Sequence, residues 1–153
     1  MAGIEFDVNK ESIVELRKFQ KEKLALLMKK VGDQSQPLKE SVLIVWRDIM
    51  DHFRDESGPE GKWTPLNPKT LARRRQGKGR FSAKILQDTG RLRQSVVTEL
   101  SQNQGKVGTN MDYARTHQKG DSSRNIPQRE FIWVSRQAAD QLFKRFIKWN
   151  SID

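Results

Sequence analysis

The stretch SVVTELSQNQGKVGT, residues 95–109, decides the fold class, because it carries the clearest β-hairpin pattern in the chain. Residues 95–101 alternate enough between apolar and polar side chains to predict a strand. The segment NQG at 103–105 is a turn signal, after which residues 106–109 return as a partner strand. A third strand is expected at EFIWVS, residues 130–135. The second half of the chain therefore predicts a small antiparallel sheet.

Helical patterns accompany this expected sheet. MDYARTHQKG, residues 111–120, predicts a short helix that Gly120 ends. Ser135 is the expected cap of a last helix over residues 136–150. Its expected buried face is formed by Ala139, Leu142, Phe143, Phe146 and Ile147.

Nearer the N-terminus, two amphipathic patterns predict an antiparallel helical pair. Apolar side chains recur at helical spacing over residues 10–31, and again from Pro37 to about Asp55. The polar segment GDQSQP at 32–37 joins them. Helices followed by a small sheet and a closing helix are an α+β arrangement.

A length of 153 residues suits one domain. We therefore expect a single domain over residues 1–153 with three parts. They are a helical pair at 10–55, a loop-rich basic region at 56–94, and a small sheet plus helices at 95–150.

The middle region is rich in loop signals. DESGPEGKWTPLNP, residues 55–68, contains three prolines and two glycines, which predicts a loop with Trp63 as an apolar anchor. Asn67–Pro68 is the expected cap and first turn of a short helix that runs to about Arg75. QGKGRFS at 76–82 has no periodicity and predicts a mobile loop.

Positive charge is concentrated in this same region. The chain has 29 Lys and Arg against 19 Asp and Glu, a net charge of +10, and residues 61–87 hold eight bases and no acid. Such a cluster attracts polyanions, although charge runs are also common on solvated faces. The bases that we expect outside the core, facing DNA or an acidic partner surface, are Arg73, Arg74, Arg75, Lys78, Arg80 and Lys84.

The chain shows no coherent catalytic set. It has no cysteine, which excludes disulfides, cysteine zinc sites and thiol catalysis. Its two histidines are His52 and His117, and the spacing from Asp112 to His117 matches no zinc signature. The glycines at 77 and 79 lack the rest of a phosphate-loop pattern. We therefore expect no enzyme, no metal site and no cofactor.

Four motifs in order resemble the phage virion morphogenesis family, the tail-completion proteins of Mu-like and related tailed phages. They are WTPL at 63–66 followed by Thr70, ILQDTGRLRQS at 85–95, VGTNMDYARTHQKG at 107–120, and IPQREFIWVS at 126–135. Together they span about half of the chain. The chain departs from the family pattern in a wide basic insertion at 73–84, and in Glu130, where such sequences often have proline.

The resemblance implies a non-enzymatic structural protein of the virion neck or tail end, assembled in the host cytoplasm. Such proteins finish the tail so that it can join a DNA-filled head. By the same analogy we expect a homo-oligomeric ring, a hexamer matching tail symmetry, next to tail terminator or tube proteins and head connector proteins. Packaged DNA passing through would make non-specific contacts with the bases. We expect no membrane partner.

Residues inside these motifs have expected roles in the fold or an interface. Gly90 permits a turn with positive φ, and Leu92 anchors the segment after it. Tyr113 and His117 are four residues apart and share one helical face. Arg129 is either a surface charge or part of an ion pair that fixes a loop. The full set is Trp63, Leu66, Gly90, Leu92, Gly108, Tyr113, His117, Gly120, Pro127 and Arg129.

Other members of the set carry open alternatives. Trp63 packs either in the core or at a protein interface, where tryptophan is enriched. Gly108 lets its strand bend or another backbone approach. Pro127 leads into the expected third strand and suits an edge position.

Two other functions compete with the family reading. The basic composition fits a standalone, sequence-non-specific nucleic-acid-binding protein. The amphipathic pattern at 10–31 fits a helix on a membrane surface. Against the membrane, that segment mixes Glu11, Glu15 and Glu22 with its lysines and has no tryptophan.

Overall fold

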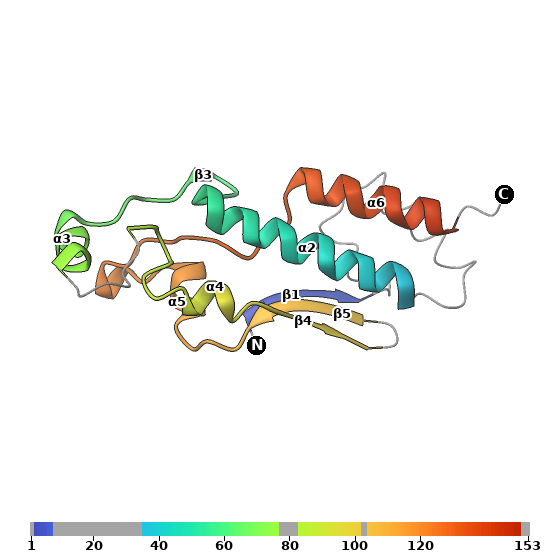
Figure 1. Ribbon diagram of the computed structural model, residues 1–153, viewed down its shortest axis with the longest axis horizontal. Helices are drawn as coiled ribbons and strands as arrows, with labels where there is room; N and C mark the ends of the chain where they lie inside the picture. Colours follow the sequence, from blue (N-terminus) through green and yellow to red (C-terminus); the bar gives the residue numbers. More distant parts are fainter. Residues whose placement is uncertain (1, 8–34, 77–82, 102–103, 151–153) are drawn as a thin grey trace. The chain divides into compact units, whose positions relative to one another are not determined.

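The computed structural model describes residues 2–7, 35–76, 83–101 and 104–150 (Figure 1). Over this part of the chain it contains helices and two small antiparallel sheets, so the expected α+β class is confirmed. The helices are α2 (Ser35–Asp55), α3 (Pro68–Gln76), α4 (Arg91–Gln94), α5 (Ala114–Lys119), a 3₁₀ helix (Ser122–Arg124) and α6 (Arg136–Asn150). The strands are β1 (Ala2–Asp7), β2 (Ser57–Gly58), β3 (Gly61–Lys62), β4 (Val97–Leu100) and β5 (Gln104–Thr109).

The chain divides into two compact units. Within the described residues, the loop unit consists of residues 2–3, 49–76, 83–97 and 108–133, and the sheet unit consists of residues 4–7, 35–48, 98–101, 104–107 and 134–150. Helix α2 contributes to both. The expected helix over 10–31 and the expected loop at 76–82 lie mostly outside the described residues.

The three-stranded sheet has the order β1-β5-β4. The expected pairing of these two strands is therefore confirmed, since β4 and β5 are neighbours. The expected bounds of the turn at 103–105 are wrong, because β5 already begins at Gln104. The expected third strand is wrong: residues 130–135 form no strand, and β1 takes that place instead. The reason is that side chains from other segments form hydrogen bonds with the backbone N–H and C=O groups of residues 130–132.

Within the sheet unit, α2 lies directly against β5. A Cβ atom at Gly105 would be only 2.5 Å from Val42 Cγ1, so glycine is the residue that lets the two backbones come this close. Close approach was expected at Gly108, which is buried in the same strand. The apolar stripe that predicted α2 faces the interior through Leu38, Val42, Val45, Ile49 and Phe53, all of which are buried.

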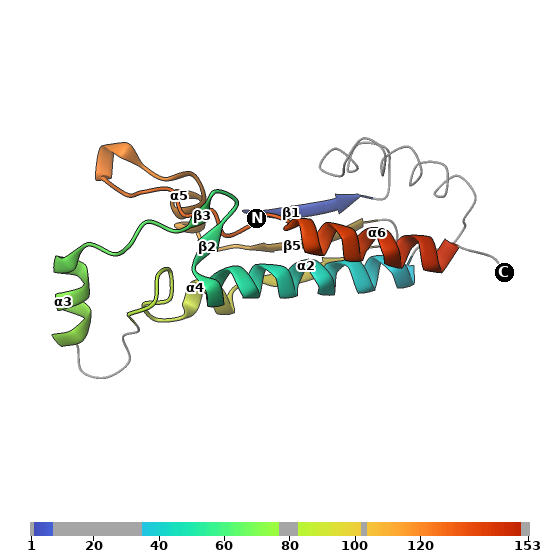
Figure 2. The same ribbon diagram turned by 90° about the horizontal axis from the view of Figure 1, so that it is seen from above.

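Helix α6 starts where the sequence predicts. Ser135 Oγ accepts a hydrogen bond from the Ala138 N–H at 3.1 Å, which confirms Ser135 as the cap. Ser135 Oγ also donates to Asp48 Oδ1 at 2.6 Å, and this contact ties the start of α6 to α2. The two helices lie side by side (Figure 2), with an ion pair between Arg145 and Glu40 at 3.4 Å. The most buried residues of α6 are Ala138 and Leu142.

In the loop unit, the expected loop at 55–68 contains a short hairpin. Strands β2 and β3 pair with Gly58 opposite Gly61, so Pro59 and Glu60 form the tip. Helix α3 then begins as expected, because Asn67 Oδ1 accepts a hydrogen bond from the Lys69 N–H at 2.9 Å.

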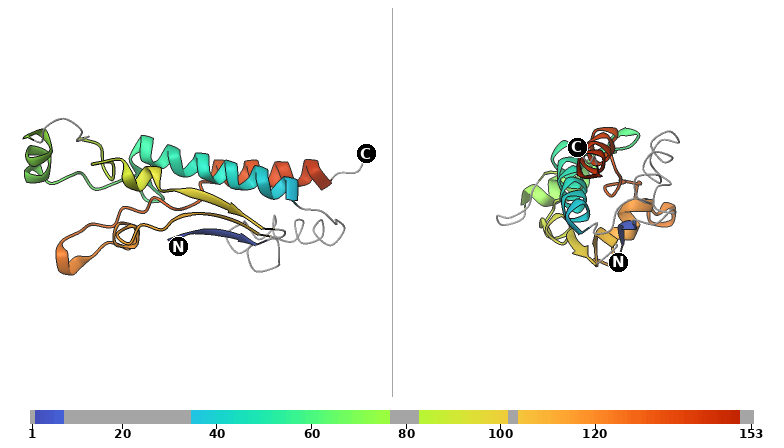
Figure 3. Two further views of the ribbon diagram at one scale, coloured as in Figure 1. Left: turned by 60° about the horizontal axis from the view of Figure 1, so that its bottom comes forward. Right: turned by 90° about the vertical axis from the view of Figure 1, so that its right-hand side faces the viewer.

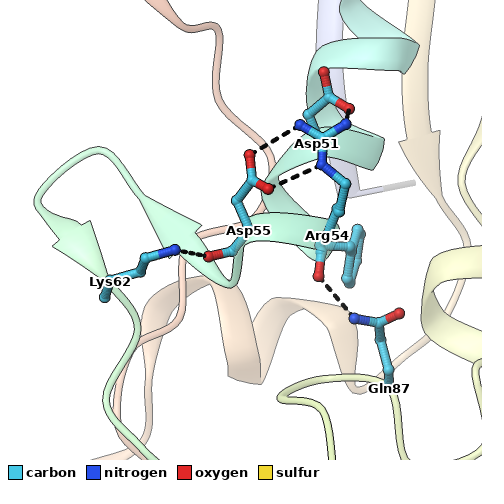
Figure 4. Close-up of polar contacts among 6 residues, drawn as sticks. Asp51, Arg54, Asp55, Lys62 and Gln87 are labelled. Atoms are coloured by element: carbon cyan, nitrogen blue, oxygen red, sulfur yellow. Dashed lines mark hydrogen bonds and ion pairs between the residues drawn. The ribbon is translucent and has the colours of Figure 1, made fainter.

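The end of α2 is held by polar contacts from later segments (Figure 4). Gln87 Nε2 donates to Phe53 O at 2.7 Å, and Lys62 Nζ donates to Asp55 O. These bonds satisfy carbonyl groups that a helix end leaves without an intrahelical partner. Arg54 pairs on the exposed side with Asp51 and Asp55.

An aromatic cluster forms the core of the loop unit. The ring centroid of Phe53 lies 5.3 Å from that of Phe131 and 6.0 Å from that of Trp63. All three side chains are buried. Of the two alternatives for Trp63, the core and a protein interface, the structure therefore shows the core.

The helices that the structure describes include none with the length and apolar composition of a membrane span.

Candidate partner-binding groove

An open groove in the loop unit gathers most of the motif residues. It encloses about 1470 Å³. Eight members of the predicted set line it: Leu66, Gly90, Leu92, Tyr113, His117, Gly120, Pro127 and Arg129. Trp63 and Gly108 do not line it. Residues from motifs that are far apart in the sequence therefore meet at one surface.

Three segments build the groove. Residues 64–74 supply one wall, residues 86–92 a second, and residues from α5 to Arg129 the third. Figure 3 shows α3 and the 3₁₀ turn at Ser122–Arg124 at the same end of the loop unit. Gly90 has a φ of 74° where the second wall turns into α4, as expected, and Leu92 is buried just after it.

Gly120 fixes the turn that follows α5. Its φ is 73°, and an added Cβ would lie 2.9 Å from the backbone N of Gln128. The expected helix stop at this position is therefore confirmed, and the chain beyond Gly120 folds back closely on the segment that carries Arg129.

Arg129 lines the groove with only 7% of its surface exposed. Its Nε donates to Thr64 O at 3.0 Å and its Nη2 to Pro65 O at 3.3 Å. Over the described residues no carboxylate pairs with this guanidinium. Within the described residues both expected alternatives are therefore wrong: Arg129 is buried, it pairs with no carboxylate there, and it fixes the 64–65 segment through backbone carbonyls.

Burial is the main cause that lowers the pKa of Arg129 below its usual value, and the nearby charge of Arg74 lowers it further. The group remains charged at any ordinary pH because its usual value lies so far above neutrality. The groove thus carries a permanent, largely desolvated positive charge.

His117 lies beside Arg129 and shares a face with Tyr113, as expected. The two rings are 6.0 Å apart between centroids in an edge-to-face arrangement. His117 Nδ1 is buried, with no hydrogen-bond partner in the described part of the chain. Burial first and the charge of Arg129 second lower the pKa of His117 below 6.5. The imidazole is therefore neutral at neutral pH.

The basic tract divides into buried and exposed members. Arg74 was expected to face outward, but its side chain is only 11% exposed and its Nε lies 3.3 Å from Asp88 Oδ1. Its Nη1 also donates to Lys84 O at 2.9 Å. The prediction considered residues 61–87, which hold no acid, and Asp88 is the next residue.

The other members of the tract behave differently or are not described. Arg73, Arg75 and Lys84 are exposed, and Arg73 lines the groove. Lys78 and Arg80 lie outside the described residues.

Gln118 is a structural residue that sequence reasoning missed. Its Oε1 accepts hydrogen bonds from the N–H groups of Phe131 at 3.1 Å and Ile132 at 3.0 Å, and its Nε2 donates to Ile132 O at 2.8 Å. One signal was available: Gln118 is four residues after the buried Ala114, so it lies on the inward face of α5.

His52 and Trp63 complete the support of this segment. Trp63 Nε1 donates to Glu130 O at 2.9 Å, and the His52 ring nitrogen Nδ1 is 3.1 Å from Phe131 O. The His52 ring also stacks on Trp133 with centroids 4.3 Å apart. Residues 130–132 are thus held rigidly, and Arg129 immediately before them is held in place.

The groove offers groups for binding anionic or polar surfaces. Its lining bases include Arg73, Arg91, Lys119 and Arg129, and its two lining carboxylates, Asp88 and Asp121, already pair with arginines. In the described residues there is no group of three or more histidine, cysteine or acidic side chains placed to hold a metal ion.

Comparisons with known proteins bear on this surface. The model of the phage virion morphogenesis family matches residues 14–149, which is well beyond the four motifs and confirms the suspected resemblance. No curated protein and no solved structure gave a significant match. Because the family match covers most of the chain, the protein belongs to the phage virion morphogenesis family.

Proposed function

We propose that this protein forms a ring at the head-proximal end of the phage tail and enables the tail to join a DNA-filled head. Membership of a virion morphogenesis family supports a virion-associated role in particle assembly. The observation that carries the finer proposal is the groove, where motif residues from three separate segments form one basic surface.

A ring subunit needs a packed scaffold and surfaces that reach its neighbours. The aromatic cluster and the buried backbone contacts of residues 130–132 supply rigidity. The groove and the exposed tip of the β2–β3 hairpin supply two different surfaces. A contact between unlike surfaces is heterologous, and heterologous contacts close into rings when the rotation permits.

Charge fits the position proposed for the ring. Six copies of a chain with net charge +10 carry about +60 in all before counterions. DNA passing through the ring would be held by sequence-blind phosphate attraction. The exposed Arg73, Arg75 and Lys84 face either this DNA or acidic surfaces of tail terminator, tube or head connector proteins.

The role is structural and non-catalytic. Assembly takes place in the host cytoplasm, and the finished protein stays in the neck of the virion. The partners are other copies of the chain and the proteins on the two faces of the ring.

A knockout with complementation tests the proposal. A phage that lacks the gene should accumulate filled heads and complete-length tails that stay separate. Purified protein added to the mixture should restore joined, infectious particles, and gold-labelled protein should mark one end of the tail in electron micrographs. Normal particles from the knockout, or label spread along the tail, would contradict the proposal.

The net charge also favours a second candidate, a standalone nucleic-acid-binding protein. Such a protein would bind any duplex as a monomer, and its affinity would fall steeply with salt. Deletion of the gene for such a protein would leave head–tail joining intact. Light scattering and the knockout therefore separate the two functions.

A further inference from the structure

We propose that the groove binds the tip of the β2–β3 hairpin of a second copy of this chain, with Glu60 of one copy paired to Arg129 of the next. The inference rests on the proposed ring and names the contact that closes it. Each side of this contact is a charged group of the loop unit that has no ion-pair partner among the described residues.

The groove has an excess of positive charge with no internal partner. Arg73, Arg91, Lys119 and Arg129 all line it, and none of them forms an ion pair with a described residue. The two carboxylates in the lining are already engaged, Asp88 with Arg74 and Asp121 with Arg124. A buried guanidinium without a carboxylate loses solvation without an ion pair in return, so an incoming carboxylate would stabilise it.

The shape of the site favours a protein carboxylate over a nucleic-acid phosphate. Arg129 is only 7% exposed, so its charge is reached by a single extended side chain and not by a wide duplex.

The described acidic side chains leave few candidates for the occupant. Most are engaged in ion pairs or hydrogen bonds. Glu60, Glu99 and Asp112 have no partner among the described residues. Asp112 adjoins Tyr113 on the groove's own rim, and Glu99 lies within strand β4. Glu60 alone is at the exposed tip of a tight turn, between Pro59 and Gly61.

The hairpin cannot occupy the groove of its own subunit in this structure. No residue from Ser57 to Lys62 lines that groove, so the tip and the groove are separate surfaces. A contact between them joins one copy to the next in a head-to-tail manner, which is the kind of contact that generates rings.

The absence of native cysteine gives a direct test. In the double variant Glu60→Cys with Thr89→Cys, one thiol is at the hairpin tip and the other in the exposed lining of the groove. Oxidation of purified protein, and of tails isolated from infected cells, should give a ladder of covalent dimers, trimers and larger species. Each single variant should stay largely monomeric, because its one thiol faces no second thiol across a head-to-tail contact. The matched control, Glu99→Cys with Thr89→Cys, should give no ladder.

Charge reversal gives a second measurement that does not depend on cross-linking. Glu60→Lys should weaken self-association, measured by light scattering, by at least about tenfold. Glu99→Lys makes the same charge change on β4 and should have no such effect. Combining Glu60→Lys with Arg91→Glu should recover part of the loss.

The two proposals fail in different ways. If the wild-type chain forms rings but the double-cysteine variant gives no ladder and Glu60→Lys assembles normally, the hairpin contact is wrong and the ring stands. If the wild-type chain self-associates neither alone nor on tails, the ring is wrong and the contact is wrong with it.

Discussion

The side-chain amide of Gln118 makes both hydrogen bonds to the backbone of Ile132 that a neighbouring strand would make. Its Oε1 accepts from Ile132 N at 3.0 Å, and its Nε2 donates to Ile132 O at 2.8 Å. This single side chain explains why the EFIWVS segment, with the composition of a strand, belongs to no sheet. It also fixes the segment that follows Arg129.

Replacing Gln118 by alanine should therefore destabilise the fold strongly. The N–H groups of Phe131 and Ile132 would lose their acceptor, and each unsatisfied buried group costs about 1–3 kcal/mol. We expect the free energy of unfolding, measured by urea denaturation, to fall by at least about 2 kcal/mol. Gln128→Ala is the control, because this exposed side chain makes one longer bond to Gln118 O and should matter by less than about 0.5 kcal/mol. Equal effects of the two variants would contradict this role.

The sequence predicted local features well because they depend on neighbouring residues. The Ser135 cap, the Asn67 cap, the Gly90 turn and the β4–β5 hairpin each follow from a few adjacent positions. The groove residues were grouped as one set by the family resemblance, and only the structure shows that most of them meet at one surface.

The predictions that failed concern features that depend on contacts between residues far apart in the sequence. Residues 130–135 have strand composition, but the partners that bind their backbone are side chains more than ten residues away in sequence. Arg129 is charged, so sequence alone favoured solvent or an ion pair over two backbone carbonyls. Strand β1 carries no turn signal that links it to β5, and such pairings between distant segments are not visible in local patterns.

Trp63 should be essential for stability. It is buried, it packs on the Phe53 ring, and its Nε1 donates to Glu130 O. Trp63→Ala should therefore lower the free energy of unfolding by about 3–5 kcal/mol. Trp149→Ala removes a side chain that is 49% exposed and should cost less than about 0.5 kcal/mol. A wild-type melting temperature for the Trp63→Ala protein would contradict the assignment of Trp63 to the core.

Gly105 should not tolerate a side chain while Val42 is present. An added Cβ would lie 2.5 Å from Val42 Cγ1, so Gly105→Ala should cost about 1–3 kcal/mol through overpacking. The double variant with Val42→Ala should cost less than the sum of the two single variants, because removing Cγ1 removes the clash. Additive costs, measured by thermal denaturation, would show that the clash is relieved in another way.

His117 should make stability depend on pH. Its pKa in the folded state is lowered below 6.5 by burial and by Arg129. The folded protein then binds fewer protons than the unfolded chain, so the His117 contribution is complete above pH 6.5 and is lost as pH falls through the folded pKa. The melting temperature of wild type should drop more between pH 7.5 and pH 5.5 than that of His117→Gln. An NMR titration of His117 with a midpoint above 6.5 would overturn this expectation.

The basic tract should separate into structural and functional arginines. Arg74→Glu would lose the pairing with Asp88 and the bond to Lys84 O, and would set two carboxylates side by side, so it should destabilise the fold by more than about 1 kcal/mol. The exposed pair Arg73→Glu and Arg75→Glu should change stability by less than about 0.5 kcal/mol for each substitution.

The same exposed pair should nevertheless block infection at the joining step. A phage with Arg73→Glu and Arg75→Glu should yield filled heads and tails that remain separate, because the proposed function requires these charges to face DNA or an acidic partner in the neck. Lys39→Glu, an exposed charge reversal on α2, is the matched control and should give a normal titre. DNA binding that is sequence-blind and falls steeply with salt, and that the double variant loses, would assign the pair to the DNA path. Loss of tail or connector binding with negligible DNA affinity throughout would assign it to a protein face. Normal infectious titre from the double variant would mean that Arg73 and Arg75 are only solvated charges.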